Sequence, residues 1–199
     1  FHDAHHIMIY LVGDLAFLPL EMLFVSLIFH KLLEDAEKRN SLKKVNMVIG
    51  AFYTQMGTAL ICALSAKDRN FDDLRKNLIF TSDWSRKDFA AAVKTVEGYD
   101  YGFSSLELPQ LKDLLQQQRT FLLKVIENPI LLEHELFSEL LMAVSHLCDE
   151  LCARADLTAL PENDREHIKA DAARAYKLLL KQWMLYIEHM KKEYPYLFS

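Results

Sequence analysis

The sequence predicts an all-α protein, with an N-terminal apolar, transmembrane helix followed by a helical bundle that contains a long C-terminal antiparallel hairpin. Only 5 Gly and 5 Pro occur among 199 residues, too few for a β-sandwich, where a turn signal recurs every ~8–12 residues. No segment alternates apolar and polar residues between turn signals, as strands do. In the C-terminal half, apolar residues instead recur at spacings of three and four, which is typical of one helix face.

Residues 7–29 are the most apolar part of the chain. Eighteen of these 23 residues are apolar and none is Lys or Arg, and the segment is long enough to cross a bilayer core of ~30 Å. Fourteen Leu, Ile, Val and Phe residues supply about −4 to −8 kcal/mol of insertion free energy. Asp14 and Glu21 at about +2.5 to +3.5 kcal/mol each offset most of that. We therefore expect a span that inserts beside another helix. The alternative is a soluble protein that buries this helix in its core.

Asp14 and Glu21 lie seven residues apart, so they share one face of the helix. Inside a membrane neither carboxyl group can face lipid. We predict that this face is an intramembrane assembly surface, against a second copy of the chain in a homo-oligomer or against a partner transmembrane helix. The same two acids are the only support for a third interpretation, a subunit of a channel or transporter.

The charged flank of the apolar segment orients it. Residues 1–30 contain no Lys or Arg, and the next fourteen contain five: Lys31, Lys38, Arg39, Lys43 and Lys44. Positive flanks stay in the cytoplasm. The sequence therefore predicts a protein of the cell membrane, contacting the lipid bilayer, with residues 1–40 as anchor and juxtamembrane segment and residues 41–199 as a cytoplasmic bundle.

Residues 45–66 have no charged residue in 22 positions. Two glycines and several polar residues, among them Asn46, Thr54, Gln55 and Thr58, dilute their hydrophobicity, so we favour a buried or membrane-surface helix. A second span remains the alternative, and it would move the rest of the chain to the other side of the membrane.

The following helices have recognisable ends. Asn70 is expected to cap a helix over residues 71–80, and Ser85 with Asp88 to form a capping box that opens residues 86–97, ended by Gly98. After a loop over residues 99–105, Pro109 should begin a helix that Pro129 stops. The last two helices are predicted over residues 130–154 and from Pro161 to Glu193.

The last two helices should form the hairpin, because the connection over residues 155–160 is short. Each carries one apolar stripe at helical spacing, made of Leu136, Leu140, Val144, Leu147 and Leu151 on the first and of Ile168, Ala172, Ala175, Leu179, Trp183 and Met190 on the second. Residues 125–153 hold six acids and no Lys or Arg. The acidic helix over residues 130–154 is either a solvated face or a surface for a basic protein partner.

Polar side stripes flank this hairpin core. At 100° per residue, four residues share one side of the first helix and three share the matching side of the second: Glu135, Glu139, His146 and Glu150, then His167, Asp171 and His189. Counting from the middle of the connection, His146 and Glu150 lie level with His167 and Asp171. Imidazoles and carboxylates at helical spacing are what a bundle metal site uses. These four are candidate ligands of a divalent metal, although the Glu-x-x-His pairs of di-iron bundles are absent. The alternative is ordinary hydrogen bonding at the edge of the core.

Other chemistry has little support. A net charge of −5 argues against a nucleic-acid partner. Nucleophile elbows, phosphate-binding glycine loops and zinc spacings are absent, so no catalytic or cofactor-binding residue is predicted. His2, His5 and His6 cluster before the apolar segment, as interfacial residues or as a metal site. Three cysteines are an odd number, which fits a reducing compartment; Cys148 and Cys152 are core positions or, alternatively, a redox pair.

Three segments carry a resemblance to a known family: residues 10–21 (YLVGDLAFLPLE), residues 46–52 (NMVIGAF) and residues 194–199 (YPYLFS). With them the whole chain resembles an uncharacterised family of prokaryotic membrane proteins. The resemblance implies a membrane anchor with a helical cytoplasmic part and no established activity. Members of the family extend further at both ends, which would make this chain a fragment.

Two functional classes follow. We favour a membrane-anchored helical interaction or regulatory module, more in keeping with a non-enzyme, because no nucleophile or cofactor loop is present. The alternative is a bundle metalloprotein or redox enzyme with its site on the hairpin over residues 130–193.

Overall fold

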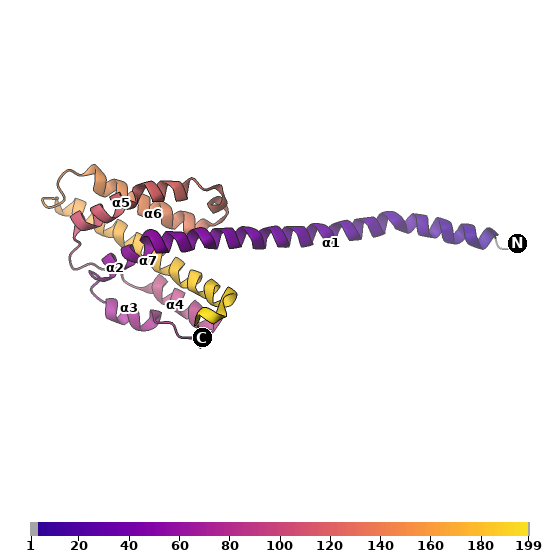
Figure 1. Cartoon of the computed structure of the whole chain (residues 1–199), viewed down its shortest axis with the longest axis horizontal. Coiled ribbons are helices and arrows are strands. Elements are labelled where there is room, and N and C mark those ends of the chain that lie inside the picture. Colours follow the sequence, from indigo (N-terminus) through magenta and orange to yellow (C-terminus); the bar gives the residue numbers. More distant parts are fainter. Residues whose placement is uncertain (1–3, 199) are drawn as a thin grey trace. The chain divides into compact units, whose positions relative to one another are not determined.

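The computed structural model describes residues 4–198, apart from the side chains of residues 4–6, 14, 132 and 133. Its contacts divide the chain into two units, residues 1–44 and residues 45–199. Within the described range every regular element is a helix, and one isolated bridge joins Asp68 to Phe103 (Figure 1). The predicted all-α class is confirmed. The elements are α1 (Ala4–Phe52), η1 (Tyr53–Gly57), α2 (Thr58–Ser65), α3 (Phe71–Leu78), α4 (Arg86–Gly98), α5 (Leu108–Ile126), η2 (Pro129–Glu133), α6 (Glu135–Ala153), α7 (Glu162–Glu193) and η3 (Pro195–Phe198).

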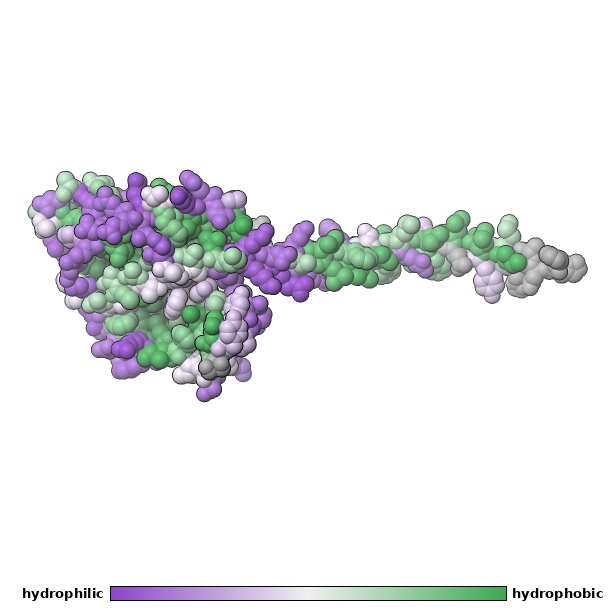
Figure 2. Space-filling model, viewed as in Figure 1, coloured by the Kyte–Doolittle hydropathy of each residue, from purple (hydrophilic) through white to green (hydrophobic). Residues whose placement is uncertain are grey.

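The first unit is the larger part of α1. Its large apolar side chains between residues 7 and 33 are exposed on all faces of the helix. Apolar colour predominates along this stretch in Figure 2, interrupted by a few polar residues. Pro19 lies inside the helix without ending it. This is the one helix long and apolar enough to cross a membrane within the described residues.

The second unit begins with residues 45–65, which form the end of α1, the π-helical turn η1 and α2. One face of this segment is buried in the bundle core, as we favoured, and includes Ile49, Tyr53 and Leu60. The Tyr53 hydroxyl donates a hydrogen bond of 2.7 Å to the carbonyl of Leu179. This contact joins the segment to α7.

The starts of α3 and α4 test the predicted helix caps. Asn70 occupies the N-cap position of α3, but its side chain makes no capping bond; Asp68 instead accepts from the Asn70 N–H at 3.2 Å. At α4 the predicted capping box is present. The Asp88 carboxylate accepts from the Ser85 backbone N–H at 2.7 Å and from its hydroxyl at 2.7 Å.

The predicted helix over residues 130–154 is wrong at its start. Residues Pro129–Glu133 form the 3₁₀ helix η2, and α6 begins only at Glu135. The Asn128 side chain accepts from the Ile130 N–H and so favours a tight turn at Pro129. The His134 Nδ1 then accepts from the Phe137 N–H at 3.3 Å and caps α6. An imidazole cap is not among the usual N-cap signals.

The hairpin is present, since α6 and α7 pack against each other. The predicted stripe on α6 is buried from Leu140 onward. On α7 the stripe is correct as far as Leu179, but Trp183 and Met190 are only partly buried, whereas Met184 and Ile187 are buried. The buried face moves because α7 also packs against α2 and α4.

Candidate functional site

The polar side of the α6–α7 hairpin brings together all four candidate metal ligands. His146 and Glu150 lie one turn apart on α6, and His167 and Asp171 lie one turn apart on α7. Residues four apart share one side of a helix. The antiparallel hairpin therefore places two imidazole–carboxylate pairs opposite each other.

The Asp171 carboxylate lies at the centre of this group. Its Oδ2 atom is 3.3 Å from Nε2 of His146 and 3.3 Å from Nε2 of His167. The His167 Nε2 atom is also 4.0 Å from Oε2 of Glu150. Ligand atoms of His146, Glu150 and His167 all lie within 4.8 Å of one another. We refer to these four residues as the His/carboxylate cluster.

Burial within the cluster is uneven. The Asp171 side chain is 16% exposed, and its Oδ2 atom is buried without a hydrogen bond of normal geometry. The side chains of His146 and His167 are 53% and 54% exposed. A buried carboxylate oxygen without a hydrogen bond costs free energy unless a proton donor or a cation reaches it. The cluster therefore combines one unsatisfied buried oxygen with two imidazoles accessible from solvent.

Arg154 borders the cluster at the end of α6. Its guanidinium donates to Oε2 of Glu150 at 2.6 Å and to the Glu150 carbonyl at 2.6 Å. The hydrogen bond from Arg154 to the Glu150 carboxylate is the main reason that the pKa of Glu150 is lower than usual. The charges of His146 and His167 make smaller contributions. Glu150 is therefore held as a carboxylate next to the imidazoles.

The other residues on the predicted side stripes lie outside the cluster. Glu139 pairs with Arg174 at 3.5 Å, and His189, near the far end of α7, has a pKa lowered by burial. Glu135 is exposed at the start of α6. The residues of the side stripe thus come together only near the connection between α6 and α7.

Several predicted sites cannot be placed. His2 lies outside the described residues, and the side chains of His5, His6 and Asp14 are not among those described. Glu21 is exposed on α1. The assembly face of Asp14 and Glu21 therefore stays a prediction.

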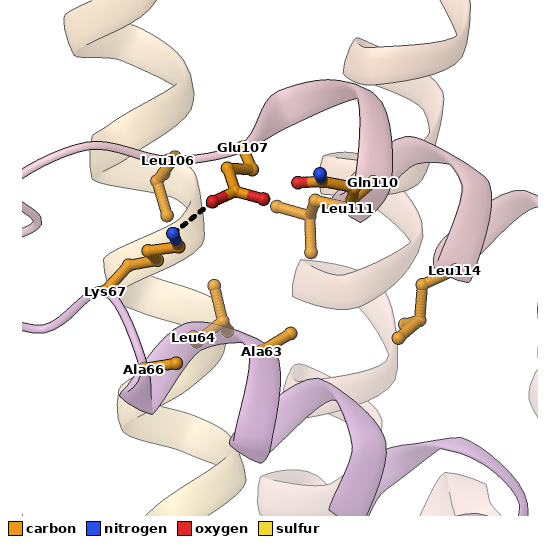
Figure 3. A pocket seen from close by; sticks show the side chains of 9 residues that line it. All are labelled: Ala63, Leu64, Ala66, Lys67, Leu106, Glu107, Gln110, Leu111 and Leu114. Carbon is orange, nitrogen blue, oxygen red and sulfur yellow. Dashed lines mark hydrogen bonds and ion pairs between the residues drawn. The ribbon is translucent and has the colours of Figure 1, made fainter.

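Sequence reasoning missed a pocket of about 360 Å³ between α2 and α5. Leucine and alanine side chains line it, and the ion pair of Lys67 with Glu107 lies at one side (Figure 3). Lys67 holds the pKa of Glu107 below its usual range. The lining comes from segments some forty residues apart in the sequence, so no local motif signalled the pocket.

A group of tyrosines around Asp68 was also missed. The Tyr99 hydroxyl donates to the Asp68 carboxylate at 2.7 Å, and the Tyr101 hydroxyl donates to the Val96 carbonyl at 2.8 Å. Desolvation by burial raises the pKa of Tyr99, Tyr101 and Tyr176. These contacts hold the loop after α4 against the segment after α2, which accounts for the single bridge between Asp68 and Phe103.

Comparisons with known proteins identify the family to which this chain is similar. A model described as "Uncharacterized protein MJ1433, C-terminal helical domain" matches residues 41–199, and one described as "MJ1433, N-terminal helical domain" matches residues 1–33. The uncharacterised protein MJ1433 of Methanocaldococcus jannaschii is 42% identical over 201 residues, an alignment that covers 100% of this chain and 81% of that protein. No solved structure matches the chain.

Proposed function

The chain belongs to the family of the uncharacterised protein MJ1433. We propose that it is a membrane-anchored helical interaction or regulatory module that assembles through its apolar N-terminal helix. The family resemblance found in the sequence is confirmed. The membrane anchor that it implied stays a prediction.

The observation that carries this proposal is the exposure of the apolar residues in α1. Between residues 7 and 33 the exposed fraction of the large apolar residues ranges from 46% at Leu18 to 72% at Met22, and none of the most apolar window is buried. A helix that is apolar on every face needs a protein core or a lipid environment. Among the described residues of its own unit, the helix has no second element to bury these faces, and we propose that lipid covers them.

The proposed orientation rests on the five basic residues between Lys31 and Lys44. They follow the apolar stretch directly, whereas no Lys or Arg precedes it. The positive-inside rule then assigns residues 45–199 to the cytoplasm. The burial of one face of residues 45–65 in the bundle supports a single span.

A basic protein partner for α6 would meet a surface that is already partly neutralised. Asp149 pairs with Arg119 at 3.0 Å and Glu139 with Arg174 at 3.5 Å. Glu127, before α6, and Glu135, at its first residue, are exposed. If a basic partner binds, we expect it to engage these two carboxylates, because it need not first break an ion pair to reach them.

Detergent-free fractionation tests the proposal. We expect the full chain to sediment with membranes, to resist alkaline carbonate and to be released by detergent. A double Leu23→Lys and Leu27→Lys variant should shift to the soluble fraction, because each lysine at mid-membrane costs about 2.5–3.5 kcal/mol. Leu42→Lys, outside the apolar stretch, is the matched control and should stay with the membrane.

Two results would contradict the anchor. One is recovery of the unmodified chain as a monodisperse soluble monomer. The other is a mature chain that lacks residues 7–29 by mass spectrometry, which would identify the segment as a cleaved leader.

A further inference from the structure

We propose that the His/carboxylate cluster of the α6–α7 hairpin binds one divalent transition-metal ion, of the class that zinc, iron(II) and manganese(II) represent. His146, His167 and Asp171 form the main ligand set, and Glu150 is a weaker fourth ligand. This inference is independent of the membrane anchor, since every ligand lies in residues 45–199.

The two distances from Asp171 to the histidines match those within a coordination shell. Metal–nitrogen and metal–oxygen bonds of ~2.0–2.2 Å put neighbouring ligand atoms about 3.0–3.5 Å apart. The Asp171 Oδ2 atom is 3.3 Å from the Nε2 atom of each of the two histidines. An ion next to these three atoms therefore needs little rearrangement of the two helices.

The buried oxygen of Asp171 gives an independent reason for a cation. It has no hydrogen bond of normal geometry although it is removed from solvent. A metal ion would bind this oxygen directly, and the two carboxylates of the cluster would balance its charge while both imidazoles stay neutral.

The donor set selects the class of metal. Two imidazoles with one or two carboxylates suit zinc, iron and manganese, whereas magnesium and calcium prefer oxygen ligands alone. The histidines are about half exposed, so solvent reaches the metal position from that side. An open position of this kind is a feature of catalytic rather than structural metal sites.

Arg154 determines which of the two carboxylates contributes more to metal affinity. Its guanidinium already engages Oε2 of Glu150 at 2.6 Å, so a metal must compete for that oxygen or use the other one. Among the described residues, Asp171 forms ion pairs only with the two histidines of the cluster, which would be its fellow ligands. Loss of Asp171 should therefore weaken metal binding more than loss of Glu150.

The test is metal titration of the full chain in detergent micelles, purified without a histidine tag and stripped with a chelator. His2, His5 and His6 are first replaced by Gln, so that only the hairpin histidines are measured. We expect one Zn²⁺ per chain by calorimetry. Co²⁺ should give visible d–d absorption that Zn²⁺ abolishes and that millimolar Mg²⁺ leaves unchanged.

Variants then assign the ligands. His146→Gln and Asp171→Asn should weaken Zn²⁺ binding at least about 100-fold, and Glu150→Gln about 10-fold. His189→Gln is the matched control. His189 lies on α7, as Asp171 does, but outside the cluster, so this variant should bind Zn²⁺ as tightly as the parent chain does. Circular dichroism checks that each variant keeps its helices.

A second measurement does not depend on the variants folding. Saturating Zn²⁺ should raise the Tm of the parent chain, because an ion that binds only the folded state stabilises it. The proposal is overturned if the parent chain shows no saturable Zn²⁺ binding and no rise in Tm. It is also overturned if folded Asp171→Asn binds Zn²⁺ as tightly as the parent does, since Zn²⁺ would then bind without the carboxylate that lies at the centre of the cluster.

Discussion

Gly57 ends the π-helical turn η1, where two aromatic rings approach the backbone. A Cβ atom at this position would lie 2.6 Å from Cδ1 of Tyr53 and 2.9 Å from Cε1 of Phe52. Both rings are buried, and the Phe52 ring packs edge-on against Phe137 of α6 at 5.5 Å between centroids. Glycine is required here for close packing, because any larger residue would push on the rings that join η1 to the hairpin.

Gly57→Ala should therefore destabilise the bundle. We expect a loss of about 1–3 kcal/mol in the free energy of unfolding, the usual cost of overpacking a core. Denaturant unfolding followed by circular dichroism measures it. Gly98→Ala is the matched control, because a Cβ there meets nothing within 4 Å. An equal effect of both substitutions would contradict the packing argument.

The capping box at Ser85 predicts a pH dependence. Hydrogen bonds from Ser85 to the carboxylate hold the pKa of Asp88 below its usual value. A carboxyl group whose pKa is lower in the folded state stabilises it above the unfolded pKa of about 4, and this contribution is lost as pH falls through the folded pKa. The stability difference between the parent chain and Asp88→Asn should therefore be largest at neutral pH and vanish in acid.

Thermal unfolding at several pH values tests the cap. Asp83→Asn, an exposed acid just before the cap, is the control and should show a smaller difference at neutral pH. A difference for Asp88→Asn that stays constant down to pH 2 would show that the charge of Asp88 is not what stabilises the start of α4.

At the scale of elements, the α6–α7 hairpin forms the centre of the bundle. Leu140 on α6 and Leu179 on α7 are completely buried. Replacing either by Ala should cost about 2–5 kcal/mol of unfolding free energy. Met142→Ala is the control, because Met142 is 60% exposed on the same helix and its loss should cost little. Denaturant titration would contradict the packing if Leu140→Ala were as stable as Met142→Ala.

The hairpin also shows how far periodicity can predict a fold and a site. Apolar spacing and a short connection were enough to predict two antiparallel helices. Counting outward from that connection then brought His146, Glu150, His167 and Asp171 to the same level, where the structure has them. The prediction needed no long-range information, because a single hairpin determines the register of both helices.

Features that depend on an unusual cap or on other elements were not predictable in this way. The start of α6 depends on an imidazole cap at His134, which no capping rule favours. The buried face of α7 beyond Leu179 depends on α2 and α4. The Lys67–Glu107 pocket and the tyrosines around Asp68 join segments far apart in the sequence, so their existence follows only from the packed bundle.

At the scale of the whole molecule, the proposed membrane anchor implies that the chain self-associates or binds a partner helix. Asp14 and Glu21 share a face of α1, and in a membrane neither carboxyl group can point at lipid without a cost of several kcal/mol. A double Asp14→Leu and Glu21→Leu variant should weaken the self-association of the chain or change its stoichiometry. Chemical crosslinking and size measurement in detergent would show this.

The same variant can also disprove the assembly surface. If crosslinked species stay unchanged while thermal stability rises, the two acids are tolerated in the helix and do not hold an assembly together. Glu34→Leu, on the charged side of the apolar stretch, is a control that should change neither result.

The native thiol of Cys62 tests the anchored topology most directly. Cys62 is exposed, in α2 beyond the single proposed span, whereas Cys148 is buried. The account predicts that a membrane-impermeant maleimide labels Cys62 in inside-out vesicles but not in intact cells, and that Cys62→Ser removes most of the label. Labelling of Cys62 from outside intact cells, or a chain that is absent from the membrane fraction, would contradict the central claim of a cytoplasmic bundle on an N-terminal membrane anchor.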